Sequence, residues 1–239
     1  MRQEWRAARE QLYPPRCPFC DRVLGLRDEC SRCSGIVRHL ELGRFRLNKG
    51  DQQLDGLEGA AAVYMYRDEV RQAILRMKYT GRACYGEVLG RILAQRLFGC
   101  TFESRGGIMI PCTVPDAALE YDLILPVPPS DHRRGFNPPE RIARPLARAL
   151  ELPLETGALH KIRTTRRQEG LRREERLKNV RDAFRADPQR LPPNARVLLV
   201  DDVITTGATL SACAQALRRA GVDSVFGLSV AVSCPDPKE

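Results

Sequence analysis

Apolar and polar residues along this chain fall into short blocks that predict strands and helices in alternation. Apolar runs bounded by turn residues are typical of buried strands, and they cover residues 60–66, 121–127, 196–202 and 224–232. Apolar residues at helical spacing predict helices, and they span residues 68–78, 85–98, 137–150 and 208–220. Strands that alternate with helices of this length predict an α/β fold, with a mainly parallel sheet flanked by helices.

The pattern divides the chain into three parts. Residues 1–40 contain a cluster of cysteines, preceded by a short charged helix that we expect over residues 1–16. Residues 41–58 show little periodicity and are predicted to form a connector, and residues 59–239 contain all the predicted strands. Residues 99–120 mix glycine, proline and short apolar pieces, so the sequence predicts no element there.

Composition and charge limit the possible classes of protein. Of the 239 residues, 43% are hydrophobic and 29% are charged, which excludes a chain that is mainly disordered. No apolar run approaches the length of about 18 residues that a membrane helix needs, and the charged N-terminus lacks the apolar segment of a secretory signal. We therefore expect a cytoplasmic protein without membrane insertion. The net charge of +9 favours a polyanionic partner such as nucleic acid, phosphate or diphosphate, although a solvated basic surface is the alternative.

Four of the nine cysteines form two pairs, Cys17 with Cys20 and Cys30 with Cys33, each separated by two residues. Such pairs let two thiolates turn toward one ion, and two pairs complete a tetrahedral zinc site. Because four thiolates leave no open position for water, the site is expected to be structural. An iron–sulfur cluster is the main alternative. Zinc ribbons bind nucleic acid, bind proteins or brace a domain, and the spacing does not choose among these roles.

The most informative stretch begins where the strand over residues 196–202 ends in Asp201 and Asp202. A helix then begins, and its N-terminus offers backbone N–H groups and the positive end of the helix dipole to a phosphate. The two carboxylates suit vicinal hydroxyls or Mg2+ instead, so the stretch as a whole fits a ribose 5-phosphate; the alternative is that these residues only cap the helix. The candidate phosphate-binding residues are Val203, Thr205, Thr206, Gly207, Ala208 and Thr209.

This stretch resembles the phosphoribosyl diphosphate (PRPP) signature of type I phosphoribosyltransferases, in which an apolar strand precedes two acidic residues and T-T-G-x-T. Other segments are similar to the ComF family: R-R-G-F-N at residues 133–137, K-Y-T-G at residues 78–81, and a spaced set between Arg163 and Phe184. With the cysteine pairs, the whole chain resembles that family, whose members join a zinc ribbon to a phosphoribosyltransferase-like domain. Pro138 is a departure, because members usually carry glutamine there.

The resemblance implies a type I phosphoribosyltransferase-like fold, structural Zn2+, and PRPP bound with Mg2+. It implies that Asp201 and Asp202 are the catalytic pair, which holds the ribose hydroxyls, and that residues 203–209 hold the 5-phosphate. The diphosphate is then expected in the loop after residues 121–127. The candidates in that loop are Pro128, Pro129, Ser130, Arg133 and Arg134.

Residues 161–181 hold nine basic and three acidic residues. The resemblance implies that this segment is a mobile loop that closes over the diphosphate, with Arg163, Arg166, Arg167 and Arg176 as candidate ligands. One alternative is a nucleic-acid contact in which the arginines neutralise phosphates. The other is a solvated helix with Glu–Arg pairs four residues apart.

Three functions stay open at this point. The first is an active phosphoribosyltransferase, and the second is a sensor that binds PRPP or a nucleotide without turnover. The third is a non-catalytic competence factor that binds single-stranded DNA or DNA-processing proteins through the zinc ribbon and the arginines. The resemblance associates all three with natural competence, the uptake of external DNA, and the sequence does not identify an acceptor base or amine.

Overall fold

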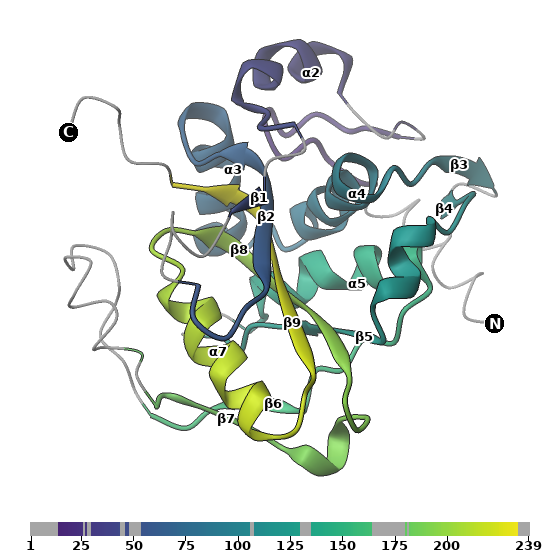
Figure 1. The fold of residues 1–239 in the computed structure, drawn as a ribbon. Helices are drawn as coiled ribbons and strands as arrows, with labels where there is room; N and C mark the ends of the chain where they lie inside the picture. Colours follow the sequence, from purple (N-terminus) through teal and green to yellow (C-terminus); the bar gives the residue numbers. More distant parts are fainter. Residues whose placement is uncertain are drawn as a thin grey trace.

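The computed structural model describes residues 14–25, 27, 30–43, 46–47, 54–105, 108–129, 135–163, 180 and 182–233. Within these residues a five-stranded sheet forms the centre of the molecule, in the order β1-β2-β9-β8-β5 (Figure 1). The strands are β1 (Arg46–Leu47), β2 (Gly59–Met65), β9 (Ser224–Val232), β8 (Arg196–Ile204) and β5 (Leu123–Pro126). β1 pairs antiparallel with β2, whereas β2, β9, β8 and β5 run parallel. This arrangement confirms the predicted mainly parallel sheet.

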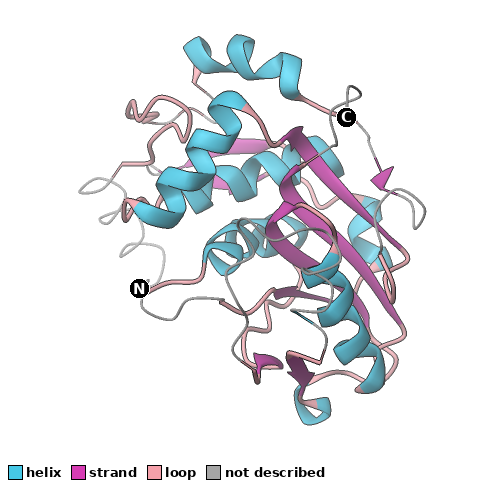
Figure 2. Cartoon of the chain, turned by 90° about the vertical axis from the view of Figure 1, so that its left-hand side faces the viewer, coloured by secondary structure: helices cyan, strands magenta, loops and turns pink. Residues whose placement is uncertain are grey.

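Helices cover both faces of the sheet (Figure 1, Figure 2). α4 (Tyr85–Phe98) and α5 (Pro138–Leu150) contribute to the core on one face, and α7 (Ala208–Arg219) contributes to the core on the other. α3 (Asp68–Tyr79) follows β2 after a short turn, in which the backbone N–H of Tyr66 donates to the carbonyl of Val232 at the end of β9. α3 therefore starts at the carboxyl edge of the sheet.

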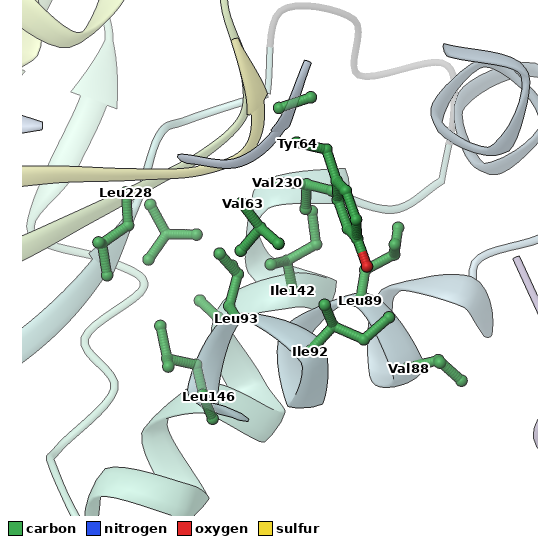
Figure 3. Close-up of a cluster of buried hydrophobic side chains, with 14 of the residues drawn as sticks. Val63, Tyr64, Val88, Leu89, Ile92, Leu93, Ile142, Leu146, Leu228 and Val230 are labelled. Atoms are coloured by element: carbon green, nitrogen blue, oxygen red, sulfur yellow. The ribbon is translucent and has the colours of Figure 1, made fainter. Parts of the chain in front are cut away.

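Each face of the sheet has its own hydrophobic core. On the α4 and α5 face, side chains of β2 and β9, such as Tyr64 and Leu228, lie against both helices (Figure 3). β8 contributes to both cores, since Leu198 belongs to the α4 and α5 face and Leu199 to the α7 face. This double burial explains why the apolar run before Asp201 is continuous and does not alternate.

α4 and α5 approach each other closely at two glycines. A Cβ atom at Gly86 would collide with Arg141, and one at Gly90 would collide with the backbone of Ile142. Because residues four apart share one face of a helix, Gly86 and Gly90 form a single flat surface on α4. The close packing of the two helices depends on this surface.

The cysteine module (residues 14–40) packs against the sheet on the α4 side. It contains α2 (Ser31–Val37) and the short 3-10 helix η1 (Arg38–Leu40). Leu24, Val37 and Leu40 of the module are buried in the same core as the residues of α4 and α5. The module therefore shares its hydrophobic core with the α/β part of the chain.

Several short elements lie where the sequence predicts none. Between residues 99 and 120, β3 (Phe102–Arg105) pairs antiparallel with β4 (Ile108–Pro111), and the 3-10 helix η2 (Asp116–Glu120) follows. A second antiparallel pair joins β6 (Leu159–Lys161) to β7 (Phe184–Ala186). The short 3-10 helix η4 (Pro188–Arg190) follows β7.

The predicted connector over residues 41–58 contains β1, and it also contains Leu54 and Leu57, which are buried in the α7 core. The charged helix predicted over residues 1–16 lies almost entirely outside the described residues. None of the helices in the described ranges is long and apolar enough to cross a membrane.

Candidate functional site

The two adjacent carboxylates lie at the carboxyl end of β8 and point to opposite faces of the sheet. This follows from the strand itself, because consecutive side chains of a strand alternate between its faces. Asp202 is directed toward α3, where it meets Lys78, and Asp201 lies on the α7 side, where its charge acts on the thiol of Cys213. The pair therefore connects the two layers of the fold at one point of the sheet edge.

Asp202 forms a buried ion pair with Lys78. The ammonium of Lys78 donates to Oδ1 of Asp202 at 2.7 Å, and the two side chains are 22% and 8% exposed. Burial lowers the pKa of Lys78, but the attraction and hydrogen bond of Asp202, with smaller contributions from Asp201 and Tyr66, together leave the pKa above its ordinary value. Lys78 is therefore a cation in the folded protein.

The surroundings of Asp201 disfavour its anionic form. Burial, and then the negative charge of Asp202, raise the pKa of Asp201 from 3.8 to about 7, although Lys78 opposes the shift. The backbone N–H of Asp202 donates to Oδ1 of Asp201 at 2.8 Å and fixes the side chain. Near neutral pH this carboxyl group can thus gain or lose a proton with little change in free energy.

The turn after β8 presents polar groups at the N-terminus of α7. Gly207 is the N-cap residue and has a φ of 74°, a left-handed conformation that favours glycine. The hydroxyl of Thr206 accepts a hydrogen bond from the N–H of Ala208 at 3.4 Å, while Thr205 and Thr209 are half-buried. The first turn of α7 contains no acidic residue. Its N–H groups and dipole therefore favour an anion.

The loop after β5 begins next to these groups. The N–H of Val127 donates to the carbonyl of Val200 at 2.9 Å, one residue before Asp201, and the side-chain amide of Asn137 donates to the carbonyl of Val127 at 2.9 Å. Pro128 and Pro129 line a cavity of about 430 Å³ together with other residues of this region. The remaining candidates of the diphosphate loop, Ser130, Arg133 and Arg134, lie outside the described residues.

The arginine-rich segment is bracketed by the β6–β7 pair. Lys161 pairs with Phe184, and the N–H of Ile162 donates to the carbonyl of Ala183 at 2.8 Å, so the two ends of the segment lie side by side. Arg163 is exposed at the start of the segment. Three further candidates, Arg166, Arg167 and Arg176, lie outside the described residues.

The four paired cysteines come together in the cysteine module. The sulfur atoms of Cys17, Cys20, Cys30 and Cys33 all lie within 4.8 Å of one another. The sulfurs of Cys20 and Cys30 are 3.7 Å apart. Sulfur ligands of a tetrahedral zinc ion, each about 2.3 Å from the metal, are separated by about 3.8 Å. The arrangement fits Zn2+ held by four thiolates.

Polar contacts fasten this cluster to α3 and α4. The guanidinium of Arg76, in the last turn of α3, donates to the carbonyls of Pro18 and Phe19 at 3.0 and 2.8 Å. Asp21 accepts a hydrogen bond of 2.8 Å from the hydroxyl of Tyr85 at the start of α4. The loop between the first two cysteines is thus bound directly to the α/β part.

Comparisons with known proteins agree with this geometry. Residues 136–238 match the family described as phosphoribosyl transferase domain. The DNA utilization protein YhgH of Escherichia coli strain K12 is 30% identical over 216 residues, which cover 87% of this chain and 86% of that protein. This chain belongs to the ComF/YhgH family. The resemblance inferred from the motifs is therefore confirmed, as is the phosphoribosyltransferase-like fold class.

Two other relatives match shorter parts of this ComF/YhgH protein. Competence protein F of Haemophilus influenzae is 37% identical over 114 residues, which cover 45% of this chain and half (50%) of that protein's length. An adenine phosphoribosyltransferase of Clavibacter michiganensis is 46% identical over 54 residues, covering 23% of this chain and 30% of that enzyme.

The sequence analysis missed one side chain at the candidate site of this ComF/YhgH protein. Lys78 belongs to the K-Y-T-G motif, which carries part of the family resemblance, but the sequence assigns it no role. Its partner Asp202 lies 124 residues further along the chain. The available signal was a lysine at the end of an amphipathic helix, directly after the buried Met77.

Proposed function

We propose that this chain binds PRPP, or another ribose 5-phosphate ligand, together with Mg2+, and that it does so in the competence or DNA utilization processes for which its relatives are named. The observation that carries the proposal is the junction of β8 and α7. There, two carboxylates precede a helix N-terminus that lacks acidic residues and has a left-handed glycine as its N-cap residue. A ligand with a phosphate at one end and hydroxyls at the other matches this order of groups.

Each part of the ligand has a counterpart in the chain. The 5-phosphate would lie at the N-terminus of α7, where Thr205, Thr206 and Thr209 add hydroxyl donors to the backbone N–H groups. The ribose hydroxyls would face Asp201 and Asp202. The diphosphate would lie toward Pro128 and the loop that follows it, since Val127 is bonded to the residue before Asp201.

The chemistry supported by such a site is transfer of the phosphoribosyl group. A nucleophile would form a bond to the anomeric carbon while the bond to the diphosphate oxygen breaks, and the electron pair of that bond leaves with the diphosphate. Mg2+, brought with PRPP, would neutralise the leaving diphosphate. The chain would position the ribose and supply arginine donors from the loop after β5 and from residues 161–181. Diphosphate release measured with a panel of bases and amines would identify the acceptor.

PRPP with Mg2+ is expected to raise the Tm of the protein. A ligand at about 100 times its Kd stabilises the folded state by about 2.7 kcal/mol, which corresponds to roughly 5–10 °C for a chain of this size. Asp201→Ala combined with Asp202→Ala should abolish the shift. The matched control replaces Asp116 and Asp223, two exposed carboxylates that precede β5 and β9, and should keep it. Absence of any shift of the wild-type Tm at millimolar PRPP would overturn the proposal.

A second candidate function is a single-stranded DNA contact through the arginine-rich segment. The names of the relatives refer to DNA utilization and competence, and the segment with nine basic residues begins at Lys161 in β6 and ends shortly before β7, the strand that pairs with β6. Several cations of one short segment could therefore contact a single DNA strand.

The salt dependence of DNA affinity tests this second function. Each phosphate contact contributes about 0.7 to the slope of log affinity against log salt for single strands. Replacing Arg166, Arg167, Arg172 and Arg173 by alanine should make the slope shallower. The matched control replaces Arg22, Arg32 and Arg38, which are exposed in the cysteine module. A slope changed only by the control set would overturn the role of the segment.

A further inference from the structure

The last turn of α3 contains two basic residues, and their side chains contact different partners. Arg76 reaches the carbonyls of Pro18 and Phe19 in the cysteine module, whereas Lys78, two residues later, reaches Asp202. A solvent-exposed lysine at a helix C-terminus is ordinary, because its charge opposes the negative end of the helix dipole. Lys78 differs from this case, because its side chain is only 22% exposed and it meets a carboxylate that is 8% exposed.

An ion pair of this kind has a definite electrostatic effect on the candidate site. Two adjacent carboxylates repel each other, and both repel an anionic ligand such as PRPP. Lys78 places a positive charge against Asp202, which is almost fully buried, and so offsets part of this repulsion from inside the protein. The charge of Lys78 also lowers the pKa of Asp201, so one lysine acts on both carboxylates.

The geometry of the ion pair leaves the carboxylate able to bind a ligand. Lys78 donates to Oδ1 of Asp202, and a carboxylate has a second oxygen, Oδ2, that can accept from a hydroxyl. A fixed Oδ1 also fixes the plane of the carboxylate, and therefore the direction in which Oδ2 accepts. The lysine reaches the carboxylate from a different element and so restrains it without occupying both of its oxygens.

We infer that Lys78 is a positioning residue of the PRPP site, which holds the Asp202 carboxylate oriented so that Oδ2 accepts a hydroxyl of the ribose. The inference rests on the proposed function. Lys78 acts through Asp202 and does not itself touch the diphosphate. It follows that the contribution of Lys78 to affinity is the same for PRPP and for ribose 5-phosphate, which lacks the diphosphate.

Calorimetric titration of this whole 239-residue chain with Mg2+–PRPP and with ribose 5-phosphate tests the inference. Breaking a buried ion pair leaves an uncompensated charge, so Lys78→Met should weaken both ligands by the same factor, at about tenfold or more. Lys78→Arg keeps the cation and should restore most of the affinity. The matched control is Arg71→Met, which removes an exposed cation from the same helix and should leave the affinity unchanged.

A second variant keeps the test informative if Lys78→Met lowers stability. If Lys78 acts through Asp202, adding Lys78→Met to Asp202→Asn should cause little further loss of affinity, because the group it positions has already lost its charge. Two independent, additive losses would overturn the inference, and so would a loss confined to PRPP. Wild-type affinity in Lys78→Met would overturn it while leaving the proposed function intact. Failure of the wild-type protein to bind either ligand would overturn both.

Discussion

At the scale of single residues, Asp201 stands out because its environment opposes its charge. The folded protein raises the pKa of this carboxyl group from 3.8 to about 7, first through burial and then through Asp202. Between these two pH values the folded state holds a proton that the unfolded state has released. Stability contributed by the protonated group is therefore present at low pH, is lost as the pH rises toward 7, and stays lost above it.

Asp201→Asn should therefore stabilise the protein more at pH 8 than at pH 5. The uncharged amide removes the cost of holding a buried anion, and the difference in free energy of unfolding between variant and wild type should grow by on the order of 2 kcal/mol between these pH values. Urea unfolding of both proteins at pH 5 and pH 8 measures this. The charged groups that act on Asp201, namely Asp202 and Lys78, are the same in both proteins. A difference independent of pH would contradict the expected cost.

Sequence reasoning reached Asp201 and Asp202 but not the contact with Lys78, and the reason is physical. The two aspartates and the hydroxyl-rich turn are consecutive, so local chemistry and spacing suffice to identify them. The ion pair of Lys78 and Asp202 joins residues 124 positions apart. It depends on how α3 lies at the edge of the sheet, which no local pattern encodes.

At the scale of elements, the long helices and strands were predictable and the short ones were not. The predicted helix over residues 85–98 coincides with α4, and the predicted strand over residues 224–232 coincides with β9. Both have a continuous apolar pattern and a clear stop or start; α4, for example, ends at Gly99, whose φ is 75°. β6 and β7 have three residues each, too few to establish an alternation.

The packing of α4 on α5 could not be derived from helical periodicity alone. Periodicity marks the apolar residues of each helix, but Gly86 and Gly90 are read only as weak helix formers. In the folded protein they let the two backbones approach, because any side chain there would collide with α5. A residue that lowers helix propensity is thus the one that allows the close contact between elements.

At the scale of the whole molecule, the cysteine module behaves as part of the main core. Its buried side chains join the core of α4 and α5, and Arg76 and Tyr85 bind its backbone and Asp21. In a module this small, a metal bound by the four cysteines would supply most of the folding free energy. Loss of the metal is therefore expected to expose part of the shared core and to weaken the whole fold.

Removal of the metal should lower the Tm of the complete chain. Cys17→Ser is expected to reduce the zinc content from about one ion per chain to near zero and to destabilise the protein by several kcal/mol. Metal analysis and calorimetry of the same samples measure both effects. The matched control is Cys112→Ser, since Cys112 is exposed and lies outside the cluster. An unchanged main unfolding transition in Cys17→Ser would show that the module is an independent unit.

The two cations in the last turn of α3 also provide a physical link between zinc binding and PRPP binding. Arg76 binds the loop of the cysteine cluster and Lys78 binds Asp202, so one turn of helix contacts both sites. Coupling between two binding equilibria is symmetric. If bound zinc raises the affinity for PRPP by a certain factor, PRPP must raise the affinity for zinc by the same factor. Competition with a chelator in the presence and absence of PRPP would therefore measure the coupling between the two sites.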